Sequence, residues 1–201
     1  MSNVWFSSDL HFGHENVIKY SNRPFSSVEE MNEGLIQNHN SLVKPGDTYY
    51  HLGDFAFAPQ EFIQKTLRRM NGNKIFVAGN HDKPKNFTGL VGQFRSDWFG
   101  KVGNLRVHMY HYPVEAWNGA YHGTVHLHGH SHGSTDNTGK LRFDVGVDCF
   151  NMYPVGLEDL EKLVAKRTEE MKEAGIDFDA SRKRTREKRI EASGNSTSTT
   201  N

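Results

Sequence analysis

The sequence predicts a layered α/β fold, and three observations lead to this prediction. Short apolar runs of strand length alternate with stretches of helical periodicity from residue 4 to residue 78. Several of these runs end at a glycine that is followed at once by Asp, Asn or His, and open α/β sheets carry their chemistry at such strand ends. The chain of 201 residues is long enough for one domain with a sizeable core.

The N-terminal half of the chain supplies this alternation. Ser26 and Glu29 have the spacing of a helix capping box, as do Ser27 and Glu30. Pro59 is well placed for the first turn of a second helix. In chain order we predict a strand at 4–8, a helix from the capping box to about residue 42, a strand at 48–52, a helix at 59–70 and a strand at 74–78.

After residue 82 the helical periodicity fades and short strands follow. Leu105, Val107 and Met109 alternate with polar residues, which is typical of a strand with one buried face. We predict strands at 94–99, 105–110, 124–128 and 141–147, a turn at 100–104, and a last helix with apolar positions from Leu157 to Met171.

The composition argues against a membrane-spanning or disulfide-bonded protein. No apolar run approaches the roughly 20 residues that a membrane span needs, and the N-terminus lacks the features of a signal peptide. Cys149 is the only cysteine, so no internal disulfide can form and a reducing compartment is favoured. The 24 basic residues balance the 24 acidic ones, so the chain as a whole lacks the net positive charge that is typical of proteins that bind nucleic acid. We expect a soluble, cytoplasmic protein.

A tail of different character follows the expected domain, which spans residues 1–180. Residues 181–201 contain six basic and two acidic side chains and end in a low-complexity segment. A disordered, solvated tail is the favoured interpretation. Contact between the basic run and nucleic acid is the alternative.

Polar clusters end five of the predicted strands. Taken alone, a pair such as Asn80-His81 is more often a turn cap, but five clusters in order favour convergence on one site. Oxygen and imidazole ligands without thiolate suit Mn²⁺, Fe, Zn²⁺, Ni²⁺ or Co²⁺. The clusters are Asp9-x-His11, Gly53-Asp54, Gly79-Asn80-His81-Asp82, His111 and Gly129-His130-x-His132.

This ordered pattern resembles the calcineurin-like metallophosphoesterase superfamily over residues 4–150. The stretches 11–16, 22–25 and 51–55 are also similar to a branch of small bacterial and phage phosphoesterases. The resemblance implies a four-layer α/β sandwich, in which two mixed β-sheets are flanked by helices. It also implies two divalent metal ions, of which Mn²⁺ is the favoured one.

The resemblance further implies a role for each position of the pattern. His81 would stay off the metals and act as the general acid, with Asp82 orienting its ring. The metal ligands would be Asp9, His11 and His132 for one ion, Asn80, His111 and His130 for the other, and Asp54 for both.

The remaining polar residues near these clusters allow two interpretations. His111 is preferred to His108 as a ligand because it lies at the end of its strand. His14 and Arg23 lie on the loop beyond the first strand, where a substrate contact and a plain surface role fit equally well. Packing or support of the ligands is predicted for His51, His126 and His128.

The expected activity is hydrolysis of a phosphodiester, and a small, nucleotide-like substrate is favoured. Two divalent ions, two aspartates and a bridging hydroxide would have a formal charge of about +1, which fits a diester monoanion. A phosphomonoesterase or protein phosphatase with the same ligands is the first alternative. A non-catalytic interaction scaffold with this fold, as in one retromer subunit, is the second.

Overall fold

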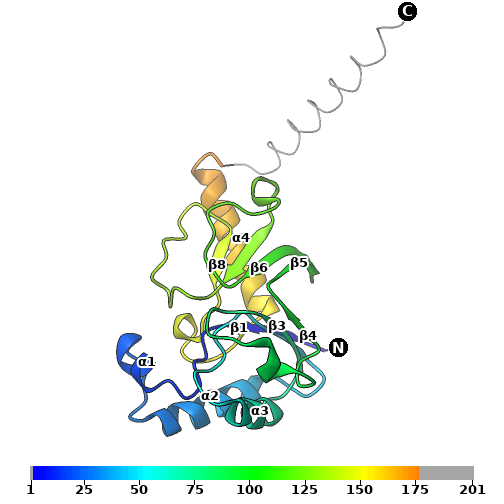
Figure 1. Ribbon diagram of the computed structural model, residues 1–201. Coiled ribbons are helices and arrows are strands. Elements are labelled where there is room, and N and C mark those ends of the chain that lie inside the picture. The colour runs from blue at the N-terminus through cyan, green and yellow to red at the C-terminus, as the bar shows by residue number, and fades with distance from the viewer. Residues whose placement is uncertain (1, 177–201) are drawn as a thin grey trace, which may run out of the picture.

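Two β-sheets form the centre of the computed structural model, which describes residues 2–176 (Figure 1). In spatial order, the first sheet consists of β4 (Gln93–Arg95), β3 (Asn73–Val77), β2 (Thr48–His51), β1 (Val4–Ser7) and β9 (Val155–Gly156). The second consists of β5 (Asp97–Val102), β6 (Leu105–Tyr110), β7 (Val125–His128) and β8 (Arg142–Asp144). Both sheets are mixed, because β9 and β5 run antiparallel to their neighbours while the other pairs are parallel. The predicted tail at 181–201 lies outside the described residues.

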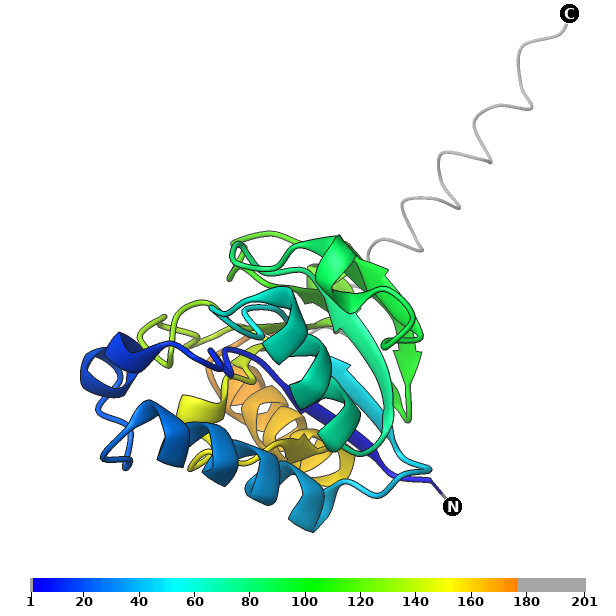
Figure 2. The ribbon, with the colours of Figure 1, turned by 60° about the horizontal axis from the view of Figure 1, so that its bottom comes forward.

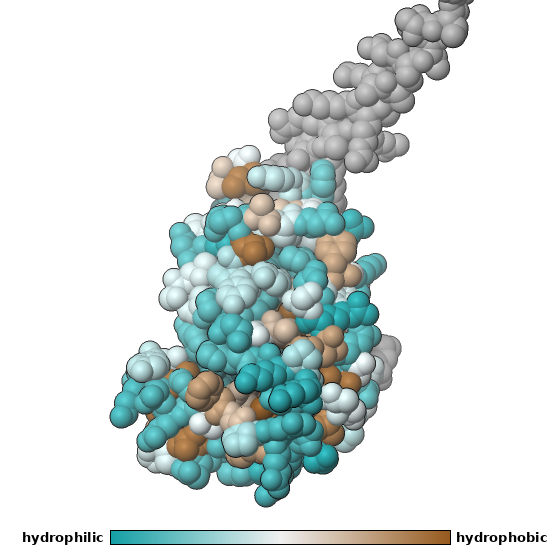
Figure 3. All heavy atoms as spheres, viewed as in Figure 1, coloured by the Kyte–Doolittle hydropathy of each residue, from teal (hydrophilic) through white to brown (hydrophobic). Residues whose placement is uncertain are grey.

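Helices and short 3₁₀ turns connect the strands. The α-helices are α1 (Glu15–Tyr20), α2 (Val28–Leu42), α3 (Gln60–Arg69) and α4 (Leu157–Glu173). The 3₁₀ turns are η1 (Pro84–Phe87), η2 (Ala120–His122) and η3 (Val147–Cys149). Between residues 2 and 176, no helix combines the length and the apolar character required to cross a bilayer. The face shown in Figure 3 is mainly hydrophilic, with apolar residues in small separate groups.

The second of the two predicted capping boxes forms at the start of α2. The Ser27 hydroxyl accepts a hydrogen bond of 3.1 Å from the backbone N–H of Glu30. The Glu30 carboxylate in turn accepts one of 2.7 Å from the backbone N–H of Ser26. The first bond satisfies an N–H group that a helix start otherwise leaves without a partner, and the second fixes the residue before the N-cap.

Two apolar cores hold the layers together. In the first, α2 and α3 cover one face of the first sheet (Figure 2), and the residues include Met31, Leu35, Leu67, Tyr49 and Phe76. The second core joins the inner faces of the two sheets and receives α4. Its residues include Phe6, Tyr50, Val107, Met109, Leu127 and Leu160. The apolar residues of the predicted alternation at 105–110 therefore form the buried face of β6.

Loop segments contact the outer face of the second sheet. Trp117 packs against the His126 ring with a centroid distance of 5.3 Å. Arg142 on β8 donates hydrogen bonds to the carbonyls of Val114 and Asp136, at 2.9 Å and 2.8 Å. The α/β class with two mixed sheets and flanking helices agrees with the prediction. The four-layer sandwich is not confirmed.

The predicted strand at 94–99 is divided between the two sheets. Phe94 in β4 stacks on Phe87 in the first core, with a centroid distance of 4.9 Å. Trp98 in β5 packs against Tyr50 in the second core at 5.4 Å. The chain passes from one sheet to the other at Ser96. A pattern of apolar residues does not reveal such a crossing, because Phe94 and Trp98 both pack in an apolar core.

Candidate metal centre

The polar clusters predicted from the sequence meet at one end of the two sheets. Strands β1, β2 and β3 of the first sheet and β6 and β7 of the second each end just before one cluster. An isolated bridge between Ser8 and Gly146 joins the two sheets at this end. Parallel strands deliver their following loops to the same edge, which explains the convergence of residues far apart in the chain.

Two groups of side chains have the geometry of metal sites. Within each group, one ligand atom per residue lies within 4.8 Å of the others. The first group is Asp9, His11 and His132, and the second is Asp54, His111 and His130. Asn80 lies beside the second group, with its Oδ1 atom 3.2 Å from Nε2 of His111. The first group consists of the residues expected for one ion.

Asp54 belongs to the second group and also faces the first. Its Oδ2 atom is 3.7 Å from Nε2 of His11 and 3.4 Å from Nε2 of His111. Its Oδ1 atom accepts a hydrogen bond of 3.0 Å from the backbone N–H of His81, which fixes the orientation of the carboxylate. Burial acts to raise the pKa of Asp54, but the His111 ring, the backbone N–H of His81 and the His11 ring together hold that pKa well below its ordinary value. Asp54 is therefore ionised, with one oxygen facing both groups.

Two of the candidate histidine ligands are oriented through their Nδ1 atoms. Nδ1 of His111 donates a hydrogen bond of 2.8 Å to the carbonyl of Leu52. Nδ1 of His132 donates one of 2.7 Å to Oδ2 of Asp148. Each bond fixes the ring so that Nε2 is the atom that faces the site, which is how metal-binding histidines are held.

Asp9 is a fully buried carboxylate whose surroundings suit a cation. Both of its oxygens accept the backbone N–H of His130, at 3.1 Å and 3.0 Å. Burial raises the pKa of Asp9 to about 7 and lowers the pKa of His11 to about 3. Buried charges in proteins are usually paired or coordinated to metals. A divalent ion between these side chains would compensate the desolvation of the carboxylate, so the donor set fits such an ion.

The backbone at the site is strained, as it often is at functional sites. Left-handed φ angles, which side chains other than glycine seldom adopt, occur at Asp9 (56°), His11 (51°), Asp54 (57°), His130 (68°) and His132 (47°). Close to these residues, two positions require glycine because there is no space for a Cβ atom. A Cβ atom at Gly79 would collide with Asp54, and one at Gly129 would collide with Ser8 and Asp9.

His81 and Asp82 have different surroundings. The His81 side chain is 38% exposed, and its Nε2 lies 3.9 Å from Oδ2 of Asp54. The Asp82 carboxylate accepts hydrogen bonds from the backbone N–H groups of Asp54, Phe55 and Gly79, at 2.8, 3.1 and 2.9 Å. It therefore holds the loops that present Asp54. The expected contact with the His81 ring is not formed, because backbone groups use both oxygens.

A comparison of sequences places the chain in a family. The uncharacterized protein MJ1445 of Methanocaldococcus jannaschii is 33% identical over 174 residues, which cover 83% of this chain and 93% of MJ1445. The chain belongs to the MJ1445 family. The Gene 66 protein of Mycobacterium phage L5 is 27% identical over 184 residues, covering 75% of this chain and 88% of the phage protein. No family model matches the sequence.

One solved structure shares the fold of this MJ1445 family member, and a second is a more distant match. A protein of unknown function from Aquifex aeolicus, AQ665, superposes with a TM-score of 0.63 at 23% identity, covering 81% of this chain and all of AQ665. YfcE, a phosphoesterase of E. coli, gives a TM-score of 0.39 at 17% identity over 72% of this chain and 78% of YfcE. The first likeness shows the fold, and the second is too distant to show a function.

In this member of the MJ1445 family, Arg23 is not available to a substrate. Its side chain is buried, and Nε and one terminal nitrogen bond the two oxygens of Asp148 at 2.8 Å each. The remaining donors contact the backbone carbonyls of Asp9 and Leu10 and the sulfur of Met31. All five N–H groups of the guanidinium are used, so the predicted phosphate contact is wrong and Arg23 is structural.

The other histidines divide between the rim and the interior. His14 caps α1 by accepting the backbone N–H of Val17 at 3.1 Å, and its ring lies 5.6 Å from that of His11. A substrate contact for His14 therefore stays a prediction. His108 pairs with Asp97 at 3.8 Å, whereas His111 belongs to the second group. The residues expected to pack or to support the ligands are all fully buried: His51, His126 and His128.

Asp148 is the residue at this site that sequence reasoning missed. It lies in η3, accepts the hydrogen bond from His132 and is held by Arg23. The sequence pattern assigned no role to Asp148, because it belongs to none of the five clusters. Because 125 residues separate Arg23 from Asp148, no local pattern could join them.

Proposed function

We propose that the protein is a phosphoesterase with two divalent metal ions that hydrolyses a small, nucleotide-like phosphodiester. The position of Asp54 is the observation that carries this proposal. One carboxylate oxygen lies within 3.7 Å of ring nitrogens from both candidate groups. A single oxygen shared in this way is what a bridging ligand between two ions requires.

The donor set supports the assignment of ligands and the class of metal. Asp9, His11 and His132 would hold one ion, and His111, His130 and Asn80 the other. Mixed carboxylate, amide and imidazole donors without thiolate favour Mn²⁺, with Fe, Ni²⁺, Zn²⁺ and Co²⁺ as alternatives. When bound, such a pair supplies a water of lowered pKa and positive charge for the phosphoryl oxygens.

His81 is the residue we assign as general acid. It is exposed at the edge of the site, and its Nε2 lies 3.9 Å from Oδ2 of Asp54. No hydrogen bond within residues 2–176 uses its ring nitrogens, so Nε2 can carry a proton to the departing ester oxygen. General acids of this kind typically contribute roughly 10²–10⁴ in rate.

Turnover by metal-stripped protein after addition of single metals tests the proposal. We expect Mn²⁺ to restore hydrolysis of bis(p-nitrophenyl) phosphate and to support the diester better than p-nitrophenyl phosphate. Two equivalents of Mn²⁺ should bind per chain. Asp54→Asn should abolish both the turnover and the binding of the second equivalent, while Asp97→Asn, at an exposed carboxylate on β5, should preserve them.

The alternatives give different results in the same experiment. A clear preference for p-nitrophenyl phosphate would replace the diesterase by a phosphomonoesterase or protein phosphatase. Binding of metal without turnover of any phosphoester would indicate an interaction scaffold. Absence of stoichiometric metal binding would contradict the proposed function itself.

A further inference from the structure

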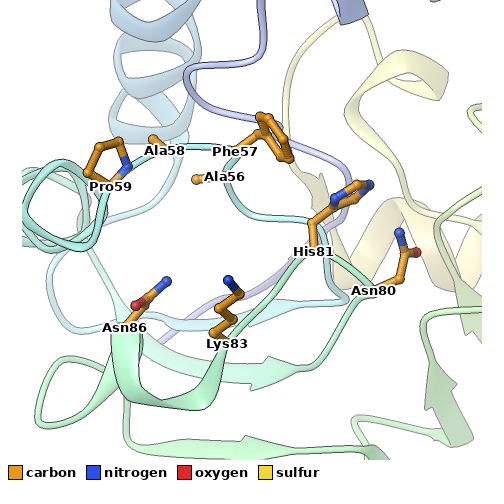
Figure 4. A pocket seen from close by; sticks show the side chains of 8 residues that line it. All are labelled: Ala56, Phe57, Ala58, Pro59, Asn80, His81, Lys83 and Asn86. Carbon is orange, nitrogen blue, oxygen red and sulfur yellow. The ribbon is translucent and has the colours of Figure 1, made fainter.

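A cavity adjoins the candidate metal centre on the side of His81. Its volume is about 460 Å³, which is within the range of roughly 300–1,000 Å³ typical of small-ligand sites. Figure 4 shows Asn86 and Lys83 on one side of it, with Phe57 and Pro59 on the other. Because His81 also lines the cavity, a group bound here would lie next to the reacting ester.

Asn86 is the feature that indicates a ligand. The residue is only 8% exposed, and its side chain points into the cavity (Figure 4). Within residues 2–176, only its backbone forms a hydrogen bond, to the carbonyl of Lys83 at 2.9 Å. Its amide atoms are open to the cavity, so a bound ligand can pair with them. An amide offers a donor and an acceptor side by side, which suits a ligand edge with the complementary pair.

The opposite wall offers an aromatic ring. Phe57 is 59% exposed, although large apolar side chains are usually buried. Its ring is held between His14 and His81, at centroid distances of 5.3 Å and 5.6 Å. The ring is thus positioned by its neighbours but remains largely open to solvent. Aromatic side chains of this kind stack on planar rings of a ligand.

Lys83 gives the cavity a positive charge. Its ammonium has no carboxylate partner among residues 2–176. The ammonium is a compact charge with three donors, so it favours polar groups of a ligand at this wall of the cavity. A lipid chain would leave both Lys83 and Asn86 without partners, and a sugar alone would leave the Phe57 ring exposed.

We propose that this cavity binds the nucleoside part of the substrate, with the base against Phe57 and its hydrogen-bonding edge at Asn86. The inference rests on the proposed function for the phosphate, since the phosphoryl group must lie at the metal centre. It assigns specificity to Phe57 and Asn86, two residues outside the candidate ligand set.

Binding of non-hydrolysable phosphonates tests the inference. In these probes a methylene replaces the ester oxygen of adenosine 5′-monophosphate, uridine 5′-monophosphate or ribose 5-phosphate, so that the probes differ only in the base. We expect calorimetry with the Mn²⁺-loaded protein to give at least about tenfold tighter binding for one nucleotide probe than for the ribose probe. Phe57→Ala and Asn86→Ala should each reduce this ratio toward one. Phe99→Ala, at a phenylalanine that is 45% exposed on β5, should retain it.

The outcomes separate the cavity from the metal chemistry. Equal affinities for all three probes would overturn the inference, as would a ratio that survives both Phe57→Ala and Asn86→Ala. If the Asn86 variant does not fold, Phe57→Ala alone decides, because Phe57 is exposed. A base-dependent affinity without hydrolysis of any phosphoester would overturn the proposed function and leave the nucleoside site standing.

Discussion

Arg23 and Asp148 form a buried ion pair with two hydrogen bonds of 2.8 Å each. The same Asp148 accepts the Nδ1–H of His132 at 2.7 Å, and the same Arg23 donates to the backbone carbonyl of Asp9 at 2.6 Å. The pair therefore connects η3 with the loops that follow β1 and β7. Two residues of the first candidate group are held in place by one ionic contact in the interior.

Replacement of Asp148 by asparagine should weaken metal binding. Asp148→Asn keeps the size of the side chain but removes the charge that polarises His132, and loss of such a partner typically weakens metal affinity by roughly 10–100-fold. Titration calorimetry with Mn²⁺ should show the loss for one of the two equivalents. The matched control is Asp159→Asn, at an exposed carboxylate on α4. Equal affinities in wild type and Asp148→Asn would show that Asp148 does not position His132.

Loss of Arg23 should reduce stability rather than substrate affinity. Arg23→Met leaves the buried Asp148 carboxylate with His132 as its remaining partner, and breaking a buried ion pair costs about 3–5 kcal/mol. Urea unfolding measures this difference. The control is Arg69→Met, which removes an ion pair with Glu33 whose side chains are 42% and 52% exposed, and should cost no more than about 1 kcal/mol. Similar losses in the two variants would contradict the buried role of Arg23.

The sequence predicted the candidate ligands better than it predicted their supports. The five clusters were readable because each follows a short apolar run, and parallel strands place their ends together. His111 could be preferred to His108 because it lies at the end of its strand, and the structure places His111 in the second group. By contrast, Arg23 pairs with Asp148, which is distant in the sequence. Without knowledge of this contact, an arginine on a loop suggested a position on the surface.

Local signals also limited the prediction of secondary structure. The capping box at Ser27 and Glu30 marked the start of α2 correctly, since both residues lie within one turn. Helix α1 was not predicted, because it has six residues, one of them buried, and its cap is the ring of His14. The resemblance implied that Asp82 orients the His81 ring, but the Asp82 oxygens accept hydrogen bonds from backbone N–H groups in the loops that follow β2 and β3.

Addition of one methyl group at Gly79 should disrupt the site. Gly79→Ala places a Cβ atom against the carboxylate and the backbone N–H of Asp54. To make room for this atom, Asp54 would have to move out of the position in which it faces both candidate groups. We expect the purified variant to retain fewer than two Mn²⁺ equivalents by elemental analysis. Gly46→Ala is the control, because a Cβ atom there meets nothing within 4 Å. Two equivalents in Gly79→Ala would show that the loop accommodates the methyl group.

His39 should make the metal-free protein sensitive to mild acid. The residue is 2% exposed, its Nε2 donates to the carbonyl of Asn71 at 3.0 Å, and burial lowers its pKa from 6.5 to about 4. Between these two values the unfolded chain binds a proton that the folded chain does not, so the free energy of unfolding falls as the pH falls. From pH 6.5 to pH 5 this residue alone should remove up to about 2 kcal/mol.

His39→Gln can keep the donor to Asn71 but cannot be protonated, so its unfolding free energy should fall less steeply over the same interval. Urea unfolding of both proteins in the presence of a chelator gives the difference, because the other buried histidines contribute equally to each. The unfolding free energy of the wild type should therefore fall relative to that of His39→Gln as the pH is lowered toward 5, whatever their separation at neutral pH. Parallel curves between pH 6.5 and pH 5 would mean that His39 binds its proton within the folded protein.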